Sequence, residues 1–115
     1  MLKIVDRVLI GVLFFGACGH AMGSFKAYGD QPMTLLWSLC GSLYVVMLGA
    51  LHVLRQFRSG DRPLAAILCF GSLAWVAASV QFGMLIGNPL DFRPVIFYVV
   101  CLGLAAFSAR QALQA

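Results

Sequence analysis

The stretch that decides the fold is residues 31–54, QPMTLLWSLCGSLYVVMLGALHVL, which contains no charged residue. A helix rises about 1.5 Å per residue, so about 20 apolar residues are enough to cross the hydrocarbon core of a membrane. Residues 63–90 form a second uncharged run of sufficient length. The runs 8–25 and 94–109 reach that length when a flanking charged side chain extends to the membrane surface. We therefore predict transmembrane helices near residues 4–24, 32–55, 63–86 and 94–112.

The overall composition supports the same interpretation. Hydrophobic residues make up 62% of the chain and charged residues only 10%, whereas a soluble domain carries about 25% charged residues. Strands of a membrane β-barrel alternate apolar and polar residues, and runs such as VLIGVLFFGA and LYVVMLGALHVL do not alternate. The predicted fold is an all-α integral membrane protein, an up-down bundle of four transmembrane helices in one domain spanning residues 1–115.

The basic residues predict the orientation in the membrane. Positive side chains gather on the cytoplasmic side, and only Lys26 and Arg93 lie on the side opposite to the others. We therefore expect both termini in the cytoplasm and the chain in the inner membrane of a bacterium. The first segment is expected to be retained, because Asp6 is unusual near the start of a signal peptide. The remaining basic residues, all on the terminal side, are Lys3, Arg7, Arg55, Arg58, Arg62 and Arg110.

The net charge of +4 is explained by this asymmetry and by attraction to anionic lipid headgroups. No nucleic-acid partner is predicted. Each short turn also carries signals for ending one helix and starting the next. Asp30 or Gln31 can cap the second helix and Asp61 the third, while Gly87 follows the third helix directly.

Polar and aromatic residues gather near the non-cytoplasmic ends of the predicted helices. Helix rise places them within about two turns of that surface. If they converge, they form an outward-facing ligand pocket, with His20 and Gln81 as recognition groups. The alternative, which we favour, is that they are interfacial or packing residues, because Trp and Tyr commonly lie at headgroup depth. The residues of this candidate pocket are His20, Ser24, Trp37, Ser38, Gln81 and Tyr98.

A second tentative polar cluster lies on the cytoplasmic side and consists of Asp6, Arg7, His52 and Arg55. One interpretation makes His52 and Asp6 a proton or ion gate. We favour the simpler one, in which His52 is compatible with a helix C-terminus and Asp6 reaches the headgroups. The serines within the helices, at positions 38, 42, 72 and 79, are expected to bond to the preceding turn of their own helix.

The four cysteines are distributed one per predicted helix. The spacings between Cys18, Cys40, Cys69 and Cys101 exclude a CxxC redox or zinc motif. Cys18, Cys40 and Cys101 lie at similar depth, so with His20 they form a weak candidate for a soft-metal or thiol site if all face inward. The favoured alternative is that cysteine acts here as a small packing residue. No metal and no cofactor is predicted.

The chain contains no glutamate, and no acidic residue lies inside a predicted span. Ion-coupled transporters generally need such a carboxylate. Small residues recur at helix-packing spacing, for example Gly19 and Gly23. The favoured function is therefore a non-catalytic membrane subunit that assembles with itself or with a larger membrane complex. The alternatives are a passive channel or transporter homodimer with an outward-facing polar pocket, and a thiol- or metal-dependent membrane enzyme.

Overall fold

The computed structural model describes residues 1–114, and this part of the chain folds into four α-helices. Each helix is long and apolar enough to cross a membrane. The first helix continues one turn beyond its predicted end at residue 24, and the other three end within two residues of their predicted ends. The helices are α1 (Leu2–Tyr28), α2 (Pro32–Phe57), α3 (Arg62–Leu85) and α4 (Phe92–Leu113).

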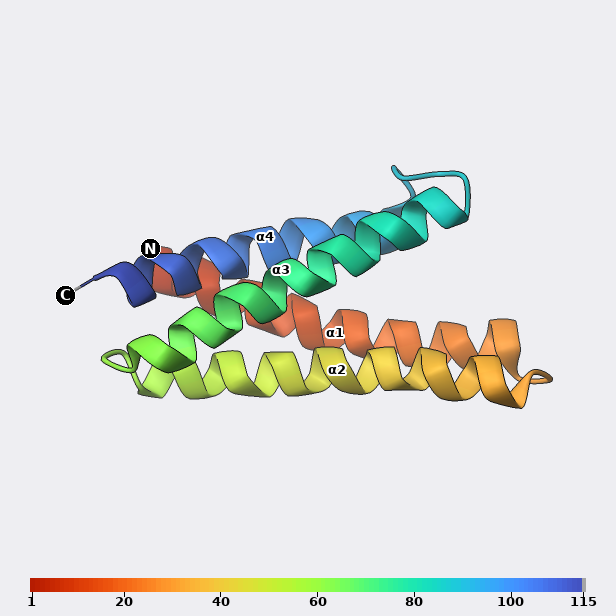
Figure 1. Ribbon diagram of the computed structural model, residues 1–115, viewed down its shortest axis with the longest axis horizontal. Coiled ribbons are helices and arrows are strands. Elements are labelled where there is room, and N and C mark those ends of the chain that lie inside the picture. The colour runs from red at the N-terminus through yellow and green to blue at the C-terminus, as the bar shows by residue number, and fades with distance from the viewer. Residues whose placement is uncertain (115) are drawn as a thin grey trace.

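The helices form two antiparallel hairpins, α1–α2 and α3–α4 (Figure 1). Both termini and the α2–α3 turn lie at one end of the molecule, which we call the terminal end. The α1–α2 and α3–α4 turns lie at the other, which we call the opposite end. Packing is more extensive within each hairpin than between the two hairpins, which diverge toward the opposite end. This divergence shapes the site described below.

Two aspartates start the helices of the second hairpin. The Asp61 side chain accepts a hydrogen bond of 3.0 Å from the backbone N–H of Leu64, and Asp91 accepts one of 3.0 Å from the backbone N–H of Arg93. These bonds satisfy N–H groups that have no partner within their own helix. At the start of α2, Gln31 occupies the capping position but makes no such side-chain bond.

Two glycines shape the α3–α4 turn. Gly87 has a φ of 76°, in the left-handed region that favours glycine. At Gly83, near the end of α3, a Cβ atom would lie 2.9 Å from the Cα of Pro89 in the turn. The turn therefore folds back directly over the last turn of α3, which keeps α4 close against α3.

The core lies where the hairpins cross and is built from fully buried apolar residues, including Leu13, Val45, Leu68, Cys101 and Leu104. Many large apolar side chains are also exposed, as expected of helices that could cross a membrane. Since lipid tails are as apolar as these side chains, close packing contributes more to helix association than apolar burial does.

Candidate binding cavity and buried polar network

A buried network of polar side chains links the helices near the terminal end. Arg55 of α2 donates two hydrogen bonds to the carboxylate of Asp6 on α1, at 2.7 and 3.0 Å. The side chain of Gln56 also donates to Asp6. The charged side chains are almost completely covered, with 4% of Arg55 and 8% of Asp6 exposed. This is a buried ion pair whose main hydrogen-bonding groups are satisfied.

The network continues through His52 to α3. Arg55 Nε donates to His52 Nδ1 at 3.1 Å, and a guanidinium has no acceptor atom. His52 Nδ1 must therefore be unprotonated, so Nε2 of the neutral ring carries the proton and donates to Ser72 Oγ at 2.9 Å. His52 and Ser72 are both fully buried. The chain of bonds from Asp6 to Ser72, called the buried network below, joins α1, α2 and α3.

Three of the four residues predicted for the terminal-side cluster take part in this network. Asp6, His52 and Arg55 come together, whereas Arg7 is exposed and outside it. Asp6, which we expected to reach the headgroups, is instead buried, because α1 turns its carboxylate toward α2, where it pairs with Arg55.

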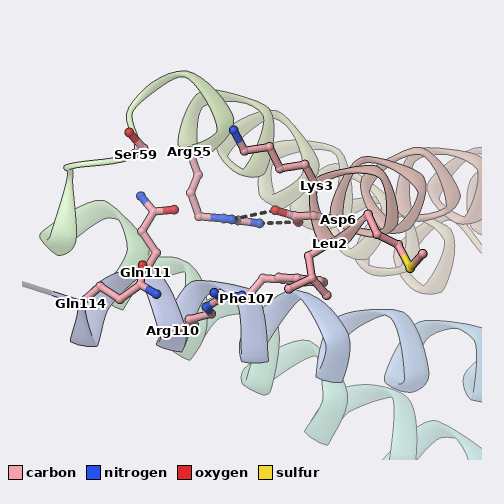
Figure 2. Close-up of a pocket in the computed structure, with 10 residues that line it drawn as sticks. Leu2, Lys3, Asp6, Arg55, Ser59, Phe107, Arg110, Gln111 and Gln114 are labelled. Carbon is pink, nitrogen blue, oxygen red and sulfur yellow. Dashed lines mark hydrogen bonds and ion pairs between the residues drawn. The ribbon is translucent and has the colours of Figure 1, made fainter.

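A cavity of about 580 Å³ lies beside this network at the terminal end. Figure 2 shows the Arg55–Asp6 pair between α2 and the start of α1, with Arg110 and Gln111 of α4 facing the same space. Lys3 is a further basic lining residue. The space is bordered mainly by the chain ends.

A larger cavity of about 860 Å³ lies between the two diverging hairpins, in the half of the molecule next to the opposite end. All four helices contribute to its wall, which is mainly apolar and aromatic. Gly19 and Gly23 form part of the α1 wall, where a Cβ atom would meet nothing within 4 Å. The exposed lining residues Trp37 and Phe92 show that the cavity reaches the protein surface.

His20 is the one histidine in the wall of this cavity, which we call the hairpin cavity. Its Nδ1 lies 2.6 Å from Ser42 Oγ, and its ring meets the rings of Trp75 and Phe97 edge to face, each at 6.2 Å between centroids. Gly41 lets the ring lie close to α2. The Nε2 atom has no hydrogen-bond partner within residues 1–114 and is not occluded. His20 is thus held in one orientation with a free ring nitrogen.

Two polar atoms in the α3 wall are buried without a partner in the described part of the chain. They are Nε1 of Trp75 and Oγ of Ser79, one helical turn apart. Trp75 is held by stacking on Tyr44, with 5.4 Å between ring centroids. Each buried polar group without a hydrogen bond costs about 1–3 kcal/mol. A hydrogen-bond partner for either group would therefore stabilise the α3 wall.

Four of the six residues predicted for the outward-facing pocket line the hairpin cavity, namely His20, Ser24, Trp37 and Ser38. The other two do not. Gln81 is exposed and outside the lining, and Tyr98 donates a hydrogen bond of 3.0 Å to the backbone carbonyl of Pro89 in the α3–α4 turn.

Sequence reasoning did not select the α3 residues Trp75 and Ser79 or Phe97 of α4, which also line the cavity. The sequence signal that points to them is a tryptophan one turn before a serine within an otherwise apolar span. That signal places both residues on one face of a helix but does not specify which face looks inward.

The helical serines bond between helices more than within them. Ser42 pairs with His20, Ser38 with Ser24 at 2.6 Å, and Ser72 with His52. Our expectation that serines 38, 42 and 72 bond to the preceding turn is therefore wrong, because a partner on a neighbouring helix lies within reach of each. Ser79 has no partner at all within residues 1–114.

The cysteines do not converge. Cys18 and Cys40 are exposed, Cys69 is half-buried and Cys101 is buried in the core. Residues 1–114 contain no group of three or more His, Cys, Asp or Glu side chains placed to hold a metal ion. The weak candidate site of Cys18, Cys40, Cys101 and His20 fails because helix rotation separates side chains that share one depth.

Comparison with known proteins gives no match to a protein family, to a curated protein or to a solved structure.

Proposed function

We propose that this protein is a passive small-molecule transporter that binds its substrate in the hairpin cavity. The supporting observation is this cavity of about 860 Å³ with a single oriented imidazole in an aromatic wall. Ligand sites are typically about 300–1,000 Å³ and combine an apolar lining with a few fixed polar groups. Four helices of membrane-spanning length support a location of the cavity within a bilayer.

The distribution of basic residues supports an orientation with the terminal end in the cytoplasm, in the inner membrane of a bacterium. In this orientation the hairpin cavity opens toward the non-cytoplasmic side. The buried network then joins α1, α2 and α3 on the cytoplasmic side of the cavity. Such an arrangement is the outward-open state of a transporter.

Transport also requires a second arrangement of the hairpins, and the α3 wall supports one. The unpaired Trp75 and Ser79 groups favour any movement of α3 that supplies them with partners. On the facing α1 wall, Gly19 and Gly23 leave open space into which α3 and α4 side chains can move. The lining includes no carboxylate, which supports passive rather than ion-coupled movement.

Substrate binding is tested by native mass spectrometry of the protein extracted gently from its host membrane. We expect a homo-oligomer, most simply a dimer, that carries a retained small molecule. Gly19→Trp fills the cavity and is expected to abolish retention. Gly11→Trp is the matched control, because Gly11 is also exposed on α1 with open space around it, but does not line the cavity.

The outcomes separate this proposal from the competing prediction of a non-catalytic subunit. Loss of the retained molecule in Gly19→Trp but not in Gly11→Trp supports binding in the cavity. An empty wild-type protein, or one whose retained molecule survives Gly19→Trp, refutes it. A stable assembly with a different membrane protein, and no retained molecule, supports the subunit function instead.

The movement itself is tested with two spin labels, at Asp30 and Asn88, in the turns at the opposite end. The labels are introduced as cysteines after the four native cysteines are replaced. We expect two populations of distances in lipid nanodiscs, corresponding to diverged and closed hairpins. One narrow population in all conditions would refute transport while leaving ligand binding intact.

A further inference from the structure

The hydrogen bond between His20 and Ser42 determines what His20 presents to the hairpin cavity. Ser42 is buried, and His20 Nδ1 is the acceptor within reach of its hydroxyl. Inside a membrane a buried O–H requires an acceptor. Ser42 therefore donates to Nδ1, and the proton of the neutral imidazole lies on Nε2. His20 consequently presents an N–H donor to the cavity.

The charged residues around the cavity also restrict the net charge of the ligand. Arg93 is the cationic lining residue, and its guanidinium is bound to Asp91 through two hydrogen bonds of 3.0 and 3.1 Å. This pair is close to neutral as a unit. With no carboxylate in the lining, a cationic ligand would find no anionic counter-charge there to offset its desolvation. The aromatic rings instead favour an apolar molecular body.

We propose that the hairpin cavity selects a neutral, largely apolar molecule carrying a carbonyl or ether oxygen, which accepts a hydrogen bond from Nε2 of His20. This inference rests on the proposed function and specifies the substrate class for the same cavity. Ser42 acts as a positioning residue, because it fixes the proton of His20 on the nitrogen that faces the ligand.

The test compares benzophenone, which has a carbonyl acceptor, with diphenylmethane, which has nearly the same shape and no acceptor. The full chain in lipid nanodiscs is photolabelled with benzophenone, and the labelled peptides are mapped by mass spectrometry. Diphenylmethane and the cation tetraphenylphosphonium serve as competitors. Labelling that persists in Gly19→Trp measures background from probe dissolved in lipid.

We expect benzophenone to bind about threefold to tenfold more tightly than diphenylmethane, as one net hydrogen bond provides. Tetraphenylphosphonium should not compete. His20→Phe should reduce benzophenone labelling by about the same threefold to tenfold and remove the preference over diphenylmethane. His20→Gln should retain the preference for benzophenone, because the amide N–H of glutamine can replace the Nε2 donor. Ser42→Ala should weaken the preference, because it releases the proton of His20.

Failure of this inference is distinguishable from failure of the proposed function. Cavity labelling with no preference for the carbonyl, with a preference unchanged in His20→Phe, or with effective competition by the cation refutes the proposed substrate class and leaves cavity binding intact. Labelling that Gly19→Trp does not reduce refutes both.

Discussion

The buried network predicts a large difference between two ion pairs of this protein. Arg55→Met removes the charge that neutralises Asp6 but keeps much of the side-chain length. It deletes the two bonds to Asp6 and the bond to His52. Leaving one member of a buried ion pair without its partner costs about 3–5 kcal/mol, and we expect a loss of this size in the free energy of unfolding.

The matched control is Arg58→Met. Arg58 pairs with Asp61 at 3.2 Å, but 58% of its side chain is exposed. Exposed pairs contribute about 0–1 kcal/mol because water already solvates both charges. The assay is equilibrium unfolding in mixed micelles of dodecyl maltoside and SDS, followed by tryptophan fluorescence.

A double variant tests the cause of the loss. Asp6→Leu combined with Arg55→Met removes both buried charges and is expected to lie within about 2 kcal/mol of wild type, since an apolar replacement of the whole pair is often neutral. Asp6→Leu alone should also cost about 3–5 kcal/mol, so the two single losses together should exceed the loss in the double variant by at least about 4 kcal/mol. Additive losses, or a loss in Arg55→Met as small as in Arg58→Met, would refute the reasoning.

Three further predictions use the same unfolding assay. Gly83→Ala should lower the free energy of unfolding by about 1–3 kcal/mol, because its Cβ would lie 2.9 Å from the backbone of the α3–α4 turn. Gly23→Ala, with open space around the glycine, should not change it measurably. Equal effects of the two substitutions would contradict this explanation. Leu104→Ala should cost about 2–5 kcal/mol, because Leu104 is fully buried, and the half-exposed neighbour Leu102 should tolerate alanine. Ser72→Ala should lower the free energy of unfolding by about 0.6–1.7 kcal/mol, from the average to the largest value for interhelical hydrogen bonds in membranes. A neutral result would show that the burial of His52 does not depend on its bond to Ser72.

The helices were predictable because length and hydropathy are properties of continuous segments. The uncharged run 31–54 determines α2 without reference to any other part of the chain. The start of α3 was predictable for the same reason, since Asp61 acts on a backbone N–H only three residues away. These features depend on local chemistry alone.

The composition of the site was only partly predictable, because sequence gives the depth of a helical residue but not its direction. Gln81 and Ser79 lie at similar depth, yet two residues along a helix turn a side chain by about 200°. Ser79 therefore faces the hairpin cavity and Gln81 the exterior. The pairing of Asp6 with Arg55 likewise required the relative rotation of α1 and α2.

The buried charges also bear on how the chain enters a membrane during synthesis. Asp6 and Arg55, together with the uncharged Gln56, all belong to the α1–α2 hairpin, so the two charges can pair with each other without α3 or α4. Within residues 62–113 the buried polar side chains are uncharged serines. Neither hairpin therefore needs the other to supply a counter-charge for a buried ionised group. Each can enter the bilayer as an independent unit, with the bond from His52 to Ser72 forming only when the two meet.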